Sequence, residues 1–173
     1  MLRKRLFEGV LMLSAVIGLL AMAGPAAAQC TPCTNVINGT NFGDTLNGTI
    51  ADDCIYAMDG VDFADGKEGN DCVDGGPGDD DLQGGFGADY IDGWTGNDRG
   101  WAGPGADTVL LWTDNDGMGG GDGPDSIYGE GDNDGISGTN HDDYLDGGSG
   151  TDTLDGGSGT DTCVNGETVT NCP

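Results

Sequence analysis

The chain has 173 residues, a formal net charge of −26, 36 glycines and few aromatic side chains. Such an acidic surface repels nucleic acid and anionic lipid, which argues against proteins that bind either and makes divalent cations the expected partners. The same composition is common in disordered chains, so a folded structure has to be argued from periodicity.

Residues 1–28 have the features of a secretory signal peptide. Residues 3–5 are basic, residues 10–23 are apolar, and residues 26–28 are alanines suited to cleavage after Ala28. The alternative is an uncleaved membrane anchor, because the apolar run is nearly long enough to cross a bilayer. We expect cleavage and a secreted or extracellular chain, at the cell surface or in the periplasm, with no stable membrane insertion.

Cleavage makes the remaining chain still more acidic. It removes Glu8 and three basic residues, which leaves 31 − 1 = 30 acidic residues against 5 − 3 = 2 basic ones, Lys67 and Arg99. If this chain folds, bound cations have to neutralise many of its carboxylates. Residues 29–38, with Cys30 and Cys33, are expected to form an N-terminal cap.

Residues 39–164 repeat with a period of nine. The clearest blocks read GGPGDDDLQ at 75–83 and GGFGADYID at 84–92, with glycine at places one, two and four, aspartate at place six and an aliphatic residue at place eight. The frame runs through fourteen blocks without insertion or deletion, and the sixth place is always aspartate. These aspartates are Asp44, Asp53, Asp62, Asp71, Asp80, Asp89, Asp98, Asp107, Asp116, Asp125, Asp134, Asp143, Asp152 and Asp161. A disordered chain would not keep phase in this way.

The eighth place is mostly apolar, and its neighbours are polar, which is typical of a short half-buried strand. Glycines before it allow a tight turn with positive φ. Each block is therefore a turn and a strand, and two blocks make one coil of eighteen residues. The sequence predicts an all-β fold, a right-handed parallel β-roll (a two-sheet solenoid) of about fourteen nonapeptide repeats, followed by a C-terminal cap at 165–173.

Successive strands of one sheet come from alternate blocks. The first column of eighth-place residues is Leu46, Ala64, Leu82, Gly100, Met118, Ile136 and Leu154, and the second is Ile55, Val73, Ile91, Val109, Ile127, Leu145 and Cys163. The second column is better filled. We expect the first sheet to be less regular near Gly100, Gly117, Gly119 and Gly135.

The sixth-place aspartates are the candidate metal ligands. Calcium takes six to eight oxygen ligands and mixes carboxylates with backbone carbonyls, which glycine-rich turns expose. An ion between adjacent turns could use Asp80 with Asp98, or Asp71 with Asp89. Seven aspartates on each edge leave six gaps, so the roll would hold several calcium ions, at most about twelve. Folding should then depend on binding.

The repeat resembles the repeats-in-toxin (RTX) family of calcium-binding β-rolls. The best matches start at Gly66, Gly75, Gly84, Gly120, Gly147 and Gly156. The resemblance implies calcium-dependent folding outside the cell. It also implies, for many members, export through a C-terminal signal, from which the signal peptide expected here departs.

The block at Leu111, LWTDNDGMG, fits worst, because it lacks the first, second and fourth glycines. Sites next to Asp116 are therefore the weakest candidates. Asp114 and Asp132 replace fourth-place glycine, either as extra ligands or as solvated turn residues.

Six cysteines in an exported chain favour disulfides, and fifteen pairings are open. Cys54 and Cys72 share the seventh place one coil apart, so they are expected to pair. Cys163 with Cys172, and Cys30 with Cys33, are the other favoured pairs.

The sequence gives little reason to expect an enzyme. The single histidine, His141, occupies a repeat turn, no HExxH or GxSxG motif occurs, and the repeat accounts for the sixth-place aspartates. An ice-binding roll needs a column of Thr or Asn, and the sequence suggests none.

The expected function is calcium binding by an exported roll with a structural or adhesive extracellular role. The alternative is a module that binds a cell-surface or extracellular partner, or a carbohydrate, through a cluster of Trp94, Trp101 and Trp112. The competing explanation is that these tryptophans only cover a weak part of the first sheet.

Overall fold

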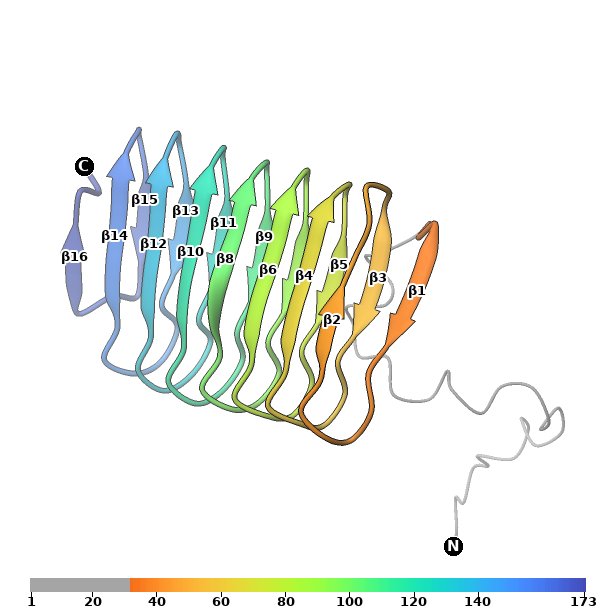
Figure 1. The fold of residues 1–173 in the computed structure, drawn as a ribbon. Helices are drawn as coiled ribbons and strands as arrows, with labels where there is room; N and C mark the ends of the chain where they lie inside the picture. The colour runs from red at the N-terminus through yellow and green to blue at the C-terminus, as the bar shows by residue number, and fades with distance from the viewer. Residues whose placement is uncertain (1–31) are drawn as a thin grey trace, which may run out of the picture.

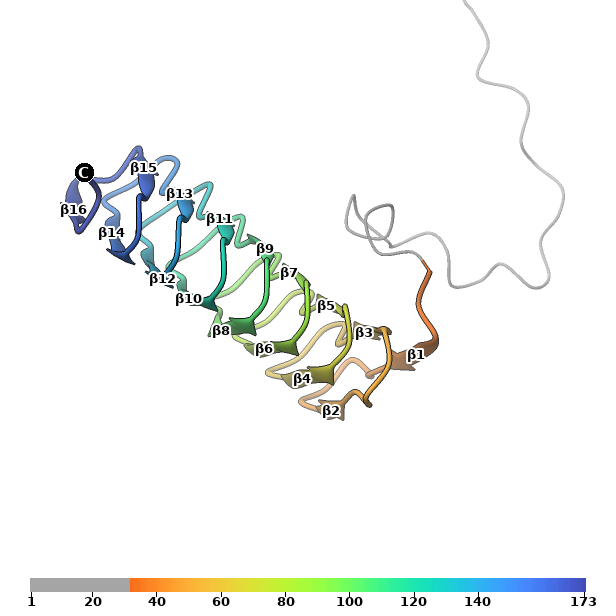
Figure 2. The same cartoon turned by 90° about the horizontal axis from the view of Figure 1, so that it is seen from above.

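The computed structural model describes residues 32–173, which form sixteen β-strands and no helix. The strands wind into a flattened coil with eight strands in each of two sheets (Figure 1). Seen from above, the two sheets face each other and short turns connect them at both edges (Figure 2). Within residues 32–173 there is accordingly no helix that could cross a membrane. The predicted signal peptide lies outside the described residues. The predicted fold class, a parallel β-roll, is confirmed.

The odd-numbered strands form one sheet, called sheet A, and the even-numbered strands form the other, called sheet B. Sheet A contains β1 (Asn35–Asn38), β3 (Asp53–Tyr56), β5 (Cys72–Asp74), β7 (Tyr90–Asp92), β9 (Thr108–Leu110), β11 (Ser126–Tyr128), β13 (Tyr144–Asp146) and β15 (Thr162–Val164). Sheet B contains β2 (Thr45–Asn47), β4 (Phe63–Glu68), β6 (Asp81–Phe86), β8 (Arg99–Pro104), β10 (Gly117–Asp122), β12 (Gly135–Asn140), β14 (Thr153–Ser158) and β16 (Thr168–Thr170).

Residues eighteen apart lie side by side on parallel strands. Ile55 pairs with Val73 and Val73 with Ile91, so eighth-place side chains stack in columns. These side chains, with few exceptions, form the apolar core between the sheets. Because side chains alternate along a strand, the seventh and ninth places face outward. On the outer face of sheet A, the rings of Tyr128 and Tyr144 are in contact, with centroids 5.6 Å apart.

Sheet B is regular where the sequence suggested that it would weaken. The strand β10 pairs in register with both β8 and β12. A Cβ atom on Gly100 would lie 1.7 Å from the carbonyl oxygen of Leu82, so the close approach of β8 to β6 requires glycine there. Leu111, at the first place of the irregular block, and Ala102 are both fully buried in the core. The core is thus completed from the first place of the block, and the expectation of irregularity is wrong.

Both ends of the roll carry an additional strand. The strand β1 lies in the segment expected to be a cap, yet it continues the frame, since Asn35 pairs with Asp53 and Ile37 with Ile55. At the other end, β16 pairs with β14 in a register of fifteen residues, with Thr168 beside Thr153. This last coil is three residues shorter than the others, so a strict nine-residue frame does not predict it.

Two disulfides tie down these ends. Cys163 pairs with Cys172, as predicted. Cys33 pairs with Cys54, with Cα atoms 5.6 Å apart, so the predicted pairs Cys54–Cys72 and Cys30–Cys33 are both wrong. Cys72 is also disulfide-bonded, and Cys30 lies outside the described residues.

The geometry of in-register parallel strands explains the first error. Cys54 and Cys72 are register neighbours, but their side chains leave the sheet in parallel directions. Their Cβ atoms therefore stay about 4.8 Å apart, the interstrand spacing, which is longer than a disulfide favours. The observed bond instead holds the segment before β1 against the outer face of β3.

Candidate calcium-binding turns

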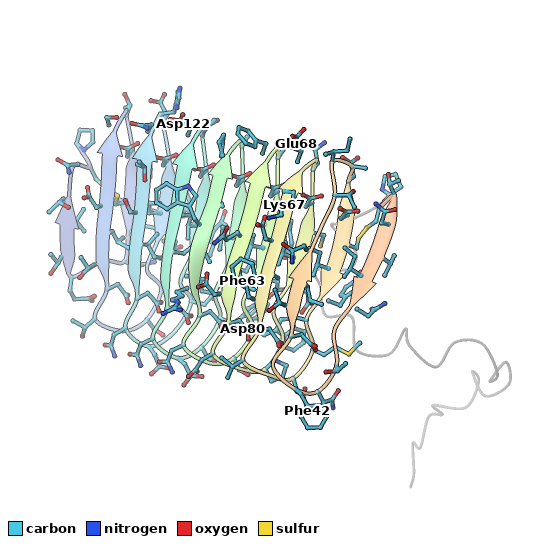
Figure 3. All side chains as sticks on the ribbon, in the orientation of Figure 1. Phe42, Phe63, Lys67, Glu68, Asp80 and Asp122 are labelled. Atoms are coloured by element: carbon cyan, nitrogen blue, oxygen red, sulfur yellow. A yellow bond between two sulfur atoms is a disulfide. The ribbon has the colours of Figure 1, made fainter. Side chains whose placement is uncertain are left out.

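The sixth-place aspartates lie at or just before the start of each strand, in two files along the edges of the roll. Asp80 marks one edge, and Glu68 and Asp122 mark the opposite edge (Figure 3). Thirteen of the fourteen predicted residues are buried, with at most 5% of their surface exposed, and Asp44 is half-buried. The structure therefore brings successive members of each file onto adjacent turns, as the eighteen-residue coil predicts.

One carboxylate oxygen of each sixth-place aspartate from Asp62 to Asp161 belongs to a hydrogen-bond ladder. The backbone N–H of Asp80 donates to Oδ1 of Asp98 at 2.9 Å, and the N–H of Asp71 donates to Oδ1 of Asp89 at 2.8 Å. The same bond recurs along both files, from Asp44 with Asp62 to Asp143 with Asp161. The ladder fixes the side chain of each aspartate toward the turn of the preceding coil.

The other oxygen, Oδ2, has no hydrogen-bond partner within the protein in twelve of these aspartates, although it is buried. They are Asp62, Asp71, Asp80, Asp89, Asp98, Asp107, Asp116, Asp125, Asp134, Asp143, Asp152 and Asp161. A buried polar group without a partner costs about 1–3 kcal/mol, and more when it is charged. A whole domain is stable by only about 5–15 kcal/mol. Twelve such oxygens therefore call for cations or protons.

The turn around each Oδ2 atom is narrow and rich in oxygen. A Cβ atom on Gly84 would lie 2.6 Å from Oδ2 of Asp89 and 2.5 Å from the carbonyl oxygen of Ala102, one coil further on. Among residues 32–173 no three acidic, histidine or cysteine side chains gather as a ready-made metal cage. A cation here would therefore need turn carbonyls besides carboxylates, which is the mixed oxygen set that calcium accepts.

Burial raises the pKa of the sixth-place carboxyls from Asp62 to Asp143 and makes them hard to ionise. Desolvation, together with the neighbouring carboxylates of Asp116 and Asp80, raises the pKa of Asp98 to about 8, although the hydrogen bond from the Asp80 N–H partly lowers it. Desolvation likewise raises the pKa of Asp107 to about 7. A cation beside Oδ2 would reverse this balance, because an adjacent opposite charge favours the ionised carboxylate.

The first coil differs from the others. Oδ2 of Asp44 accepts from the N–H and hydroxyl of Thr40, and Oδ2 of Asp53 accepts from the same groups of Thr49. These threonines stand at the second place, where many blocks have glycine. The two aspartates are thus hydrogen-bonded within their own turns and are the poorest candidates for a cation.

Two further residues extend the files, and the sequence frame missed both. Asn35 stands at the sixth place of the nine residues that end with β1, and its side-chain amide donates to Oδ1 of Asp53. At the other end, Oε2 of Glu167 accepts from the N–H of Asp152 at 2.7 Å, as an aspartate would in a full-length coil. In the sequence, both residues could have been found from the spacing between places six and eight. Asn35 stands two residues before the apolar Ile37, and Glu167 stands two residues before the apolar Val169.

The irregular block at Leu111 keeps the ladder intact. Oδ1 of Asp116 accepts from the N–H of Asp98 at 2.8 Å, and its Oδ2 is unpartnered like the others. The two fourth-place aspartates are exposed: Oδ2 of Asp114 accepts from Gly96 N at 3.2 Å, and Oδ2 of Asp132 accepts from Asp114 N at 3.3 Å. They therefore stand outside the turn that holds the Asp116 carboxylate.

A file of asparagines occupies the fifth place along the same edge. The Nδ2 of Asn133 donates to Oδ1 of Asn115 at 2.8 Å, Asn115 donates to Asn97, and Asn133 accepts from the N–H of Thr151. The expectation that no Asn column exists is therefore wrong. These amides bond mainly to each other and to the backbone, and the carboxylates of Asp114 and Asp132 interrupt the surface beside them.

The three tryptophans do not form one cluster. Trp101 lies on the outer face of sheet B against Gly119, where an added Cβ would be 2.3 Å from its ring. Trp94 and Trp112 lie in turns at the edge that follows sheet A. The predicted three-tryptophan site is therefore wrong, and a pair remains.

The family model described as the RTX calcium-binding nonapeptide repeat matches the chain in four copies, at residues 38–71, 74–109, 120–140 and 136–163. These copies cover most of the roll. The chain belongs to this family. The RTX matches omit residues 110–119, the irregular block, although its strand and its aspartate keep their places. Comparison with curated proteins returned no match. RTX repeats bind calcium, and the matched segments contain every sixth-place aspartate except Asp116.

Proposed function

We propose that this RTX protein is exported, folds by binding calcium along both edges of its β-roll, and has a structural or adhesive rather than catalytic role outside the cell. The observation that carries the proposal is the set of twelve buried Oδ2 atoms without partners. A row of divalent cations would complete their coordination and offset their repulsion. Two disulfides at the ends of the roll support an oxidising compartment.

The proposed ligands are the sixth-place aspartates, in pairs on adjacent turns, with turn carbonyls completing each set. Because threonines already bond to Oδ2 of Asp44 and Asp53, the first gap on each edge should be the weakest. Saturation should therefore need about ten ions rather than the geometric limit of about twelve.

A calcium titration of the mature chain, followed by far-UV circular dichroism in reduced and oxidised forms, tests this function. We expect little β-structure in chelator and a cooperative gain as calcium is added, with magnesium much less effective because it tolerates irregular coordination poorly. Calorimetry should then give about ten ions per chain. A chain that is fully β-structured at neutral pH in chelator, or that does not respond to calcium, contradicts the proposal.

A further inference from the structure

The turns that follow sheet A depart from the repeat in three consecutive coils. Non-glycine residues hold the second place at Trp94, Trp112 and Glu130, and the fourth place at Asp114 and Asp132. We call these five residues the acidic-aromatic edge. All five have left-handed backbones, with φ between 70° and 83°. The family match also breaks here, at residues 110–119.

The fold does not require these side chains. Gly76 and Gly148 hold the second place on the same edge with φ of 85° and 84°, and glycine adopts this conformation without strain. L-residues adopt it at a cost, above all bulky ones such as tryptophan. Strained residues of this kind concentrate at functional sites. Met58, Lys67, Thr139 and His141 hold the same places in other turns with positive φ, so strain alone does not single out this edge. The five residues differ because they lie in three adjacent coils of one edge, and this clustering points to a role for their side chains.

A buried carboxylate orients the indole of Trp112. Nε1 of Trp112 donates to Oδ1 of Asp92 at 2.8 Å; Asp92 is fully buried, and its Oδ2 has no partner in the protein. Trp94 holds the same place one coil earlier, beside Asp74; burial and the Asp92 carboxylate raise the pKa of Asp74 to about 7, and the Trp94 indole partly lowers it. Its Nε1 is buried and falls short of a regular hydrogen bond. With the N–H edge turned inward, 37% of Trp112 stays exposed.

Neither basic side chain, lysine or arginine, of residues 32–173 forms an ion pair with the acidic-aromatic edge. Lys67 pairs with Asp65 and Arg99 with Asp81, both on sheet B. Asp114, Glu130 and Asp132 are exposed. They are spread along successive turns, and within residues 32–173 no three such groups converge on a point. The edge suits an extended cationic partner better than a single metal ion.

The guanidinium group matches both features of the edge. It is planar and weakly hydrated, it stacks on indole, and its donors pair with carboxylates. We propose that the acidic-aromatic edge is a docking site for an extended, arginine-bearing polypeptide segment, whose guanidinium groups stack on Trp94 and Trp112 and pair with Asp114, Glu130 and Asp132. The proposal requires the folded, calcium-loaded roll but not a particular number of ions.

The decisive variant is Trp94→Gly with Trp112→Gly, which restores the residue of the regular repeat and leaves the charge unchanged. The probe is a synthetic alternating arginine–threonine peptide, with a lysine–threonine peptide for comparison. Binding is measured by calorimetry in calcium at physiological salt. We expect the variant to lose about tenfold or more in affinity, with its melting temperature unchanged or raised, and we expect the lysine peptide to bind more weakly than the arginine peptide.

Charge-matched variants test whether the peptide binds the acidic-aromatic edge itself or is only attracted to an acidic protein in general. Asp114→Asn with Asp132→Asn should weaken binding about as much as the tryptophan variant. Asp142→Asn with Asp155→Asn, which removes two carboxylates elsewhere, should change it little. The proposal is overturned if both asparagine pairs weaken binding equally or if the glycine variant binds as well as the wild type. It is also overturned if the roll binds a neutral oligosaccharide instead of the peptide.

Circular dichroism of each sample distinguishes a failure of the docking proposal from a failure of the proposed calcium-dependent folding. A wild-type roll that folds in calcium but does not bind the peptide contradicts only the docking edge. A chain that does not fold in calcium contradicts calcium-dependent folding. A glycine variant that melts lower and still binds shows that the indoles only pack.

Discussion

At the scale of the residue, each sixth-place aspartate has two oxygens in different environments. In the twelve from Asp62 to Asp161, Oδ1 closes the backbone ladder, and Oδ2 is buried without a partner, as in Asp98. The two can be separated by mutation, because an asparagine keeps one carbonyl oxygen for the ladder and replaces the other oxygen with an amide nitrogen. That nitrogen cannot bind calcium.

The variant Asp98→Asn should retain the fold in calcium but bind up to two ions fewer, because Asp98 borders the gaps to both Asp80 and Asp116. It should lose about 3 kcal/mol of calcium-dependent stability for each ion lost at a calcium concentration near 100 Kd. Calorimetry and thermal melting in calcium measure both quantities. Asp79→Asn is the matched control. It removes one charge on the same edge and introduces the residue found at the same place in Asn97 and Asn115. Similar losses from both variants would show that only net charge matters.

At the scale of the element, the ends of the roll are where strands lack a neighbour on one side. The strand β1 has no strand beyond it in residues 32–173, and 61% of Val36 is exposed. An open strand edge is a template for pairing with other chains. The Cys33–Cys54 bond fixes the segment before this strand. We therefore expect the disulfide to protect the first coil.

Cys33→Ser with Cys54→Ser should lower the free energy of unfolding by about 2–4 kcal/mol, because the bond restricts the unfolded chain. Amide hydrogen exchange in calcium should show faster exchange in β1 and β3 while β9 stays protected. Serine at Cys163 and Cys172 is the control, since it should affect the opposite end alone. Equal acceleration along the roll would contradict an end-specific role.

At the scale of the whole molecule, the stacked carboxylates tie stability to pH. Desolvation raises the pKa of Asp89 to about 6 and those of Asp80 and Asp116 to about 7. A carboxyl whose pKa is higher in the folded state binds extra protons there. Its contribution is complete below the unfolded value near 3.8 and disappears as the pH rises through the folded value.

The calcium-free chain should therefore be most stable near pH 4 and lose stability between about pH 4 and pH 8. In calcium the trend should reverse, because protons compete with the ion for the same oxygens. Thermal melts followed by circular dichroism across this range, in chelator and in calcium, give the two profiles. A calcium-free chain that becomes more stable toward pH 8 would contradict the raised pKa values.

The amino-acid sequence by itself determined the repeating part of this protein. Aspartate fills place six and mostly apolar residues fill place eight at a fixed period of nine. Because each short strand buries only one face, two blocks must face each other across the core, and they form a coil of eighteen residues. That local rule suffices for the fold class, the core columns from Leu46 to Leu154, and the two files of aspartates.

Only the tertiary structure decided the features that break the period. The last coil is three residues short, so Glu167 substitutes for an aspartate by position rather than by spacing. The disulfide partner of Cys54 depends on how the chain crosses the outer face of β3, which no repeat encodes. Trp94 and Trp112 separate from Trp101 because turns and strands of one block face different sides of the roll. A periodic sequence specifies what recurs, and the exceptions take their meaning from their neighbours in space.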